Sequence, residues 1–229
     1  MASLISPGFF GEPADARRTE FDIKNEQCQM EGSPADLIFA GDSITQFFSL
    51  PTYFRQFGYL LNRGISGDTA EILAKRLEAD VLQLHPRCAV ILIGINNTWR
   101  LDGSFDDPHG CCTCEEILDT VRESCRSILS QAKAYGQRMI LCSVLPIWFQ
   151  SEKKAERQAL ILSINQELQR LCQQAQVLYA DCYSAMTSEN GIDLKKEYSY
   201  DGVHPNAQGY RAMAGVLTPV LHQLLRSQP

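Results

Sequence analysis

The chain has 229 residues, of which 45% are hydrophobic and 21% are charged, and its formal net charge is −6. These values fit a single globular domain, residues 1–229, whose core needs neither disulfides nor a structural metal. The sequence has no dense basic run, which argues against nucleic acid as a partner because phosphate binding relies on clustered Lys and Arg. We also predict no membrane span, since no stretch is long and apolar enough.

The predicted elements alternate short apolar strands with long amphipathic helices. We expect residues 1–35 to be irregular. After them come, in chain order, strand 36–40, strand 59–62, helix 69–82, strand 88–93, helix 115–134, strand 139–144, helix 152–175, strand 177–180 and helix 206–225. Strand 88–93 is apolar throughout, as is typical of parallel strands covered on both faces. The alternation predicts βαβ units, and therefore an α/β fold with a parallel sheet between layers of helices.

The N-terminus and the cysteines indicate the compartment. No basic region precedes the first apolar residues, and Ser6-Pro7-Gly8 interrupts them, so we expect no secretory signal and a cytoplasmic location. The odd number of cysteines, nine, favours free thiols over a disulfide framework.

One short segment has the residue types of a metal site. His109, Cys111, Cys112 and Cys114 lie within six residues, but no second pair of ligands follows them at zinc-site spacing. We therefore predict that the protein binds no metal and uses no cofactor. A metal or redox sensor built on this loop is an alternative interpretation.

Polar residues follow several of the predicted strands, at the edge where such sheets bind ligands. Ser43 follows the first strand, Gly67 follows the second and Asn96 follows the third. Asp201 and His204 lie between the fifth strand and the last helix. We expect these five residues, which come from four separated segments, to meet at one edge of the sheet.

These residue types fit acyl transfer. A serine hydroxyl needs an adjacent base to act as a nucleophile, and the imidazole needs a carboxylate to orient it. We predict that Ser43 attacks, that His204 accepts and returns the proton, and that Asp201 holds His204. The backbone N–H groups of Ser43 and Gly67 and the side-chain amide of Asn96 would form the oxyanion hole. A glycine at position 67 lets the backbone approach a substrate closely.

Each of these residues also has a simpler interpretation when taken alone. Ser43 could be a helix N-cap, Gly67 and Asn96 could be turn residues, and Asp201 and His204 could be ordinary surface residues. The catalytic interpretation is favoured because all of them coincide with strand ends.

Four further residues are candidates for lining a substrate pocket. Asp42 is expected mainly to cap the turn beside the nucleophile. Asn97 and Trp99 follow the predicted oxyanion asparagine, and Trp148 lies in the loop after the fourth strand. The aromatic residues could equally form a partner-facing patch or part of the core.

The same segments carry a family resemblance. They resemble, in order, the four sequence blocks of the SGNH or GDSL hydrolases: residues 41–44, 65–69, 94–97 and 201–205. One block alone is weak evidence, but four in order with strands between them are specific. The resemblance implies a flavodoxin-like three-layer α/β/α fold, with five parallel strands in the order 2-1-3-4-5. It also implies esterase or lipase chemistry without a metal.

Two positions depart from the family pattern. Ile44 replaces the leucine of the family name, and Asn97 stands where many members have aspartate. The pair Asn96-Asn97 is similar to that in the platelet-activating-factor acetylhydrolase branch, which implies short acyl groups, especially acetyl. Neither change removes a predicted catalytic group.

The expected function is that of a serine esterase acting through an acyl-enzyme on small carboxylic esters, such as acetyl esters of a carbohydrate or a small lipid. A lysophospholipase, a thioesterase or an acyltransferase on the same fold is an alternative, and so is a catalytically silent binding protein. The resemblance also makes a homodimer possible. The acyl length, the alcohol and the role of residues 101–114 are left open.

Overall fold

The computed structural model describes residues 12–32, 34–103 and 111–226. Within them, one sheet has five strands, all parallel, in the order β2-β1-β3-β4-β5. The strands are β1 (Leu37–Gly41), β2 (Leu60–Gly64), β3 (Cys88–Leu92), β4 (Met139–Cys142) and β5 (Leu178–Ala180). The predicted fold class and strand order are therefore confirmed.

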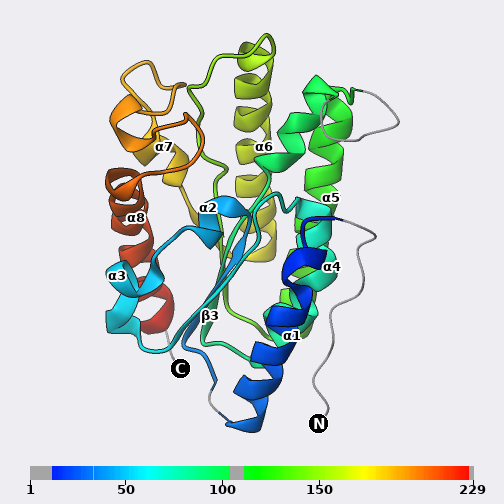
Figure 1. The fold of residues 1–229 in the computed structure, drawn as a ribbon, viewed down its shortest axis with the longest axis vertical. Helices are drawn as coiled ribbons and strands as arrows, with labels where there is room; N and C mark the ends of the chain where they lie inside the picture. Colours follow the sequence, from blue (N-terminus) through cyan, green and yellow to red (C-terminus); the bar gives the residue numbers. More distant parts are fainter. Residues whose placement is uncertain (1–11, 33, 104–110, 227–229) are drawn as a thin grey trace.

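Helices cover both faces of this sheet (Figure 1). The long helices are α1 (Asp15–Met30), α4 (Ala70–Asp80), α5 (Cys114–Ala134), α6 (Lys154–Ala175) and α8 (Ala207–Arg226). Three short helices are α2 (Ser43–Gln46), α3 (Leu50–Phe54) and α7 (Cys182–Met186). Figure 1 shows α1, α4, α5 and α6 on one side of the sheet and α3, α7 and α8 on the other. This is the three-layer arrangement that right-handed crossovers produce for this strand order.

The core lies between these layers. Every residue of β1, β3 and β4 is buried, because side chains on both faces of a parallel sheet point into helices. The predicted strands and long helices begin and end within two residues of the observed ones. Short 3-10 helices also occur at residues 55–57, 82–84, 96–102 and 196–198.

The expectation that residues 1–35 are irregular was wrong for residues 15–30, which form α1. Its buried residues are Phe21 and Asn25, one turn apart. Asn25 Nδ2 donates to the carbonyl oxygen of Ala79 and to Asp80, both on α4. Because one of the two buried side chains is polar, the sequence of α1 has little of the apolar periodicity from which a helix is predicted. Residues 1–11 lie outside the described part of the chain.

No helix in the described ranges is long and apolar enough to cross a membrane.

Candidate active site

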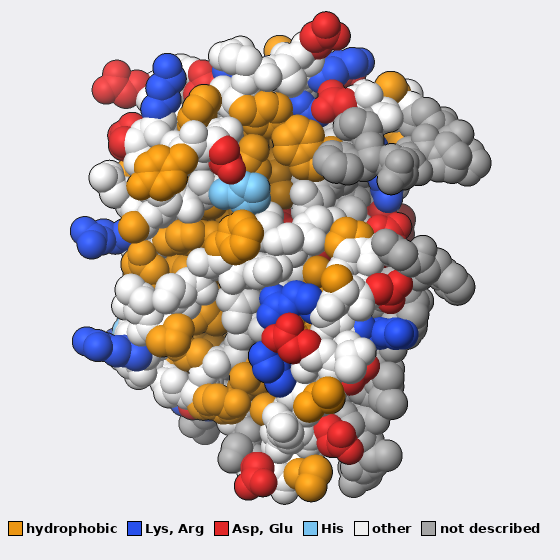
Figure 2. All heavy atoms as spheres, in the orientation of Figure 1, with side chains coloured by type: hydrophobic (Ala, Val, Ile, Leu, Met, Phe, Trp, Pro, Cys, Tyr) orange, Lys and Arg blue, Asp and Glu red, His pale blue; other side chains and the backbone are white. Residues whose placement is uncertain are grey.

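Three side chains from the two ends of the chain meet at the carboxyl edge of the sheet. Ser43 is the first residue of α2, and its Oγ lies 2.9 Å from Nε2 of His204. Nδ1 of His204 lies 2.6 Å from Oδ2 of Asp201. In the view of Figure 2, a histidine, drawn in pale blue, lies at the surface between hydrophobic side chains. The three predicted triad residues therefore form one continuous hydrogen-bonded chain.

The carboxylate of Asp201 is held by its own segment. Its Oδ1 accepts hydrogen bonds from the backbone N–H groups of Val203 and His204 and from the hydroxyl of Ser199. Burial opposes ionisation, but the hydrogen bonds from His204 and Val203 dominate and lower the pKa of Asp201 to about 2. The ionised carboxylate can only accept, so Nδ1 of His204 carries the proton and Nε2 is left to accept from Ser43.

A glycine lets this segment pack against the loop after β4. Gly202 has φ +86°, and a Cβ there would lie 2.6 Å from the backbone nitrogen of Phe149. The backbone N–H of Trp148 donates to the carbonyl oxygen of Gly202 at 3.0 Å. A larger residue at position 202 would push the segment that carries Asp201 and His204 away from β4.

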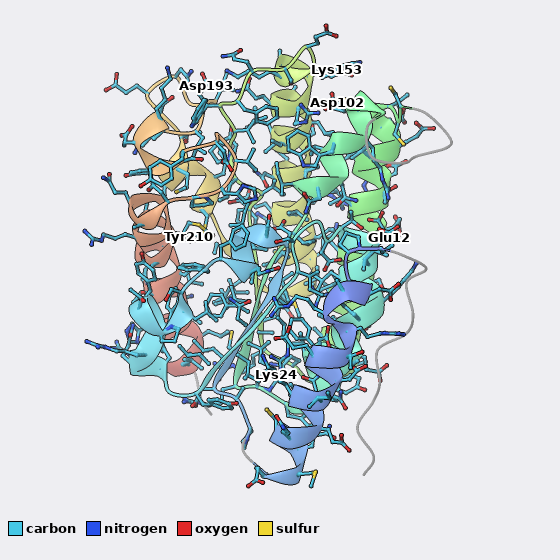
Figure 3. All side chains as sticks on the ribbon, viewed as in Figure 1. Glu12, Lys24, Asp102, Lys153, Asp193 and Tyr210 are labelled. Carbon is cyan, nitrogen blue, oxygen red and sulfur yellow. The ribbon has the colours of Figure 1, made fainter. Side chains whose placement is uncertain are left out.

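The turn that carries the nucleophile is capped from within. Oδ1 of Asp42 accepts from the backbone N–H of Ile44 at 2.9 Å, which confirms Asp42 as the cap of α2. Tyr210 donates to the carbonyl oxygen of Ile44, and Figure 3 shows Tyr210 between α8 and α2. Asp42 is 0% exposed. Burial raises its pKa to about 7, against the hydrogen bond from Ile44.

Besides Ser43, the candidate oxyanion donors Gly67 and Asn96 lie on two neighbouring loops. Gly67 has φ +84° and a Cβ there would lie 2.8 Å from Cγ of Pro13, so the backbone favours glycine here. Asn96 Nδ2 donates to the carbonyl oxygen of Asp68 at 2.9 Å, which joins the two loops. Among the described residues, the backbone N–H groups of Ser43 and Gly67 have no hydrogen-bond acceptor. They are therefore available to an oxyanion.

A buried guanidinium lies beneath these loops. Nη2 of Arg76 donates to the carbonyl oxygen of Gly41 at 3.1 Å and to Oδ2 of Asp68 at 2.6 Å. Nη1 donates to Oδ2 of Asp80 at 2.9 Å, and all three ionic side chains are 2% exposed or less. Arg76 thus connects the residue before the nucleophile turn with the loop that follows Gly67. We refer to Arg76, Asp68 and Asp80 as the Arg76 network.

The sequence contains a signal for this network that lies outside the predicted catalytic groups. Arg76 falls on the apolar face of helix 69–82, in register with Ile72, Leu73 and Leu77. A charged residue among core positions needs a buried partner. That requirement indicates Asp80, one helical turn away, as a partner of Arg76.

Two of the predicted pocket residues have no surface that a substrate could reach. Asp42 and Asn97 are both 0% exposed. Asn97 Oδ1 accepts from the backbone N–H of Ala70, and its Nδ2 donates to Glu71. The prediction that these residues line a pocket was wrong, because their polar atoms cap α2 and the start of α4 instead.

The two tryptophans have different surroundings. Trp99 packs on the ring of Phe149, with centroids 4.9 Å apart, and the guanidinium of Arg157 lies 4.4 Å above it. Arg157 also pairs with Asp102, which Figure 3 shows at the upper end of the molecule. Trp148 packs against Gly202, where it supports the triad segment. Contact of either tryptophan with a substrate stays a prediction.

The cysteine-rich loop is only partly described. His109 lies outside the described residues. Cys114 Sγ lies 3.6 Å from a carboxylate oxygen of Glu156. In the part of the chain that the structure describes, no group of three or more His, Cys, Asp or Glu is placed to hold a metal ion. The absence of a metal or cofactor stays a prediction.

Comparison with known proteins identifies relatives across most of the chain. The family model of the GDSL-like lipases and acylhydrolases matches residues 39–212. An acetylxylan esterase of Geobacillus stearothermophilus is 25% identical over 207 residues, which cover 80% of this chain and 92% of that protein.

Two solved structures resemble the fold. A GDSL-like lipase from Bacteroides thetaiotaomicron VPI-5482 superposes with a TM-score of 0.71 at 24% identity, covering 88% of this chain and 98% of the other. A protein from Streptococcus pneumonia, provisionally named a platelet activating factor, has a TM-score of 0.71 at 25% identity, covering 90% and 93%.

The family match and the geometry concern the same residues. The matched range contains the end of β1 with Ser43, the Gly67 and Asn96 loops, and the segment with Asp201 and His204. The chain therefore belongs to the GDSL-like lipase/acylhydrolase family and is an esterase or acylhydrolase.

Proposed function

We propose that this protein is a serine esterase that hydrolyses small carboxylic esters, such as acetyl esters of a carbohydrate or a small lipid, through an acyl-enzyme intermediate. One observation carries the proposal. The hydroxyl of Ser43, the imidazole of His204 and the ionised carboxylate of Asp201 form one hydrogen-bonded chain of 2.9 Å and 2.6 Å. This is the connectivity that turns a serine into a nucleophile.

Acylation follows from that connectivity. Nε2 of His204 accepts the hydroxyl proton as Oγ of Ser43 attacks the ester carbonyl carbon. The ionised Asp201 stabilises the imidazolium that forms. Negative charge develops on the carbonyl oxygen, and the N–H groups of Ser43 and Gly67 and the amide of Asn96 are the proposed donors to it.

The intermediate then collapses and is hydrolysed. The bond between the carbonyl carbon and the alcohol oxygen breaks, and His204 gives its proton to the departing alcohol. This leaves the acyl group on Oγ of Ser43. A water molecule, deprotonated by Nε2 of His204, attacks this ester and releases the carboxylic acid, which restores the serine hydroxyl.

The relatives support a hydrolase and favour a carbohydrate ester, since one of them is an acetylxylan esterase. The intact set of catalytic groups argues against a silent binding protein. A lysophospholipase, thioesterase or acyltransferase would use the same groups, so the acyl chain and the acceptor must be determined by experiment.

The test is hydrolysis of p-nitrophenyl esters from acetate to decanoate by the wild type and by Ser43→Ala. We expect rapid turnover of acetate, a decline with longer chains, and a loss of about 10³-fold or more in kcat for Ser43→Ala. Ser49→Ala is the matched control, because Ser49 is exposed and follows the same helix.

Other outcomes would point elsewhere. Full activity of Ser43→Ala would refute the serine mechanism. A rate that peaks at long acyl chains would favour the lysophospholipase or thioesterase alternative. A wild type that is inactive on every ester would favour the binding protein.

A further inference from the structure

A surface groove of about 1230 Å³ lies along β2, one of the two edge strands of the sheet. One wall comes from α1, where Lys24 and Gln27 line it, and Figure 3 shows Lys24 on the lower half of α1. The rest comes from β2 and from the residues that precede β2 and follow α2, including Tyr59, Leu61 and Phe47. We refer to this feature as the β2 groove.

The β2 groove begins beside the candidate catalytic base. Phe47 lines the groove and its ring lies 5.6 Å from the ring of His204, measured between centroids. In the proposed reaction, His204 gives its proton to the departing alcohol, so the alcohol oxygen must lie on the His204 side of Ser43. The alcohol portion of a substrate is therefore positioned to pass over Phe47 into the groove.

The two ends of the groove carry exposed aromatic rings. Phe47 is 55% exposed and Tyr59 is 46% exposed. Gly64, the last residue of β2, packs against Gln46, next to Phe47, whereas Tyr59 directly precedes the first residue of β2. Five strand residues at about 3.3 Å each separate these ends by about 16 Å. The groove can therefore hold an extended chain of several rings.

The α1 wall of the groove carries polar groups, opposite Leu60 and Leu61 of β2. Gln27 is exposed, and its side-chain amide has no partner within the described residues. Arg17 and Lys24 both pair with Glu20, at 3.0 Å and 2.6 Å, so this one carboxylate offsets part of their positive charge. Aromatic faces together with amides and charged hydrogen-bond donors suit sugar rings, which present C–H faces to aromatic rings and hydroxyls to hydrogen-bonding groups.

The same contacts disfavour other occupants. An added peptide strand would need the free backbone groups on the outer edge of β2. At Gly64 these are occupied, because its carbonyl oxygen accepts from Arg17 at 2.8 Å and its N–H donates to Asn62 Oδ1 at 2.9 Å. A long alkyl chain would have to lie along charged residues of α1, which would cost desolvation.

We propose that the β2 groove binds the carbohydrate chain that bears the ester, so that the substrate is an acylated oligosaccharide. The inference rests on the proposed function, because that function defines the side of Ser43 on which the alcohol lies. It adds a binding site, with Phe47 nearest the serine and Tyr59 at the far end, that becomes filled only as the glycan grows longer.

The first experiment measures kcat/KM for acetylated xylose, xylobiose, xylotriose and xylotetraose, with p-nitrophenyl acetate as the reference ester. For the wild type we expect kcat/KM to rise by about tenfold or more from the monosaccharide to the tetrasaccharide, which corresponds to about 1.4 kcal/mol of added binding. Tyr59→Ala should abolish most of that rise and Tyr59→Trp should retain it. Tyr135→Ala, an exposed tyrosine outside the groove, is the matched control.

The outcomes separate the two proposals. If p-nitrophenyl acetate hydrolysis depends on Ser43 but kcat/KM does not rise with glycan length, or Tyr59→Ala keeps the rise, the groove proposal fails while the esterase stands. A preference for acetylated lipids over oligosaccharides also overturns the groove proposal. If no ester is hydrolysed, calorimetric binding of unacetylated xylotetraose decides: binding that Tyr59→Ala removes supports the groove, and no binding refutes it.

Discussion

The two halves of the candidate active site are held in different ways. The half with Ser43, the candidate nucleophile, and the candidate oxyanion donors lies on the Arg76 network, whose side chains are 2% exposed or less. The half with the acid and the base is exposed: the side chains of Asp201 and His204 are 55% and 36% accessible. It is held by hydrogen bonds within one short segment. Stability and activity should therefore be coupled in the first half and separable in the second.

The difference fits the chemistry of each half. Oxyanion donors act best when they are fixed before charge develops, because no reorganisation is then needed. A general base must receive a proton and return it, and deacylation requires water to reach it. A buried ionic support suits the first task, and an exposed segment suits the second.

The largest effect should come from the exposed half. Asp201→Asn presents an N–H to Nδ1 of His204 and favours the wrong tautomer, which lowered kcat by about 10⁴-fold in a well-studied serine protease. We expect a loss of that order on p-nitrophenyl acetate. The free energy of unfolding in urea should change by less than about 1 kcal/mol, since exposed charge pairs contribute little.

Asp119→Asn serves as the control for this experiment. Asp119 is 53% exposed and pairs with Arg122 on α5, so it has an accessible ion pair without catalytic contacts. A kcat for Asp201→Asn within tenfold of the wild type would contradict the assigned role of Asp201.

The next effect concerns the buried half. Arg76→Met removes the cation from two buried carboxylates, Asp68 and Asp80. We expect it to lower the free energy of unfolding in urea by about 3–5 kcal/mol. Arg87→Met breaks the exposed pair with Asp36, in which Arg87 is 50% accessible, and should lower the free energy of unfolding by less than about 1 kcal/mol. Equal losses for the two variants would refute the contrast between the halves.

The smallest effect is a pH dependence centred on Asp42. Burial raises its pKa from 3.8 to about 7, so between these values the folded chain keeps a proton that the unfolded chain has lost. The free energy of unfolding contributed by this group therefore falls as pH rises through that window. Asp42→Asn cannot titrate. The free energy of unfolding of this variant, relative to that of the wild type, should therefore rise by about 2 kcal/mol from pH 5 to pH 7.

Urea unfolding at several pH values measures how the free energy of unfolding of each protein changes with pH. The test is this change with pH, and not the difference between the two proteins at a single pH. Asp68, whose pKa burial raises to about 6, is present in both proteins and largely cancels in the comparison. Asp201 acts outside the window: its pKa of about 2 adds stability that is lost only as pH falls below about 4. Parallel curves for wild type and Asp42→Asn would mean that Asp42 is ionised when buried.

The parts of the molecule that could be predicted from sequence have strong local signals. β3 is a continuous apolar run closed by glycine, and the nucleophile follows a strand of the same kind. The spacing between Asp201 and His204 allows their side chains to meet within one turn, so this pair could be predicted from the sequence without knowledge of the fold.

The parts that were missed depend on contacts between distant segments. α1 buries Asn25 against α4, so half of its packing face is polar. Asn97 was expected in a pocket but caps α4, because an amide that faces a neighbouring helix has the same sequence signature as one that faces solvent. The role of Arg76 required the position of Gly41, which only the sheet brings beside it.

The exposure of the acid–base segment also bears on how this enzyme can evolve. Tyr200, next to Asp201, is 88% exposed, so substitutions there disturb almost no packing. Substitutions at this position can therefore change the surface beside Asp201 without lowering the folded fraction of the protein. We expect specificity for new esters to arise first at such positions, while the residues beneath the serine stay constant.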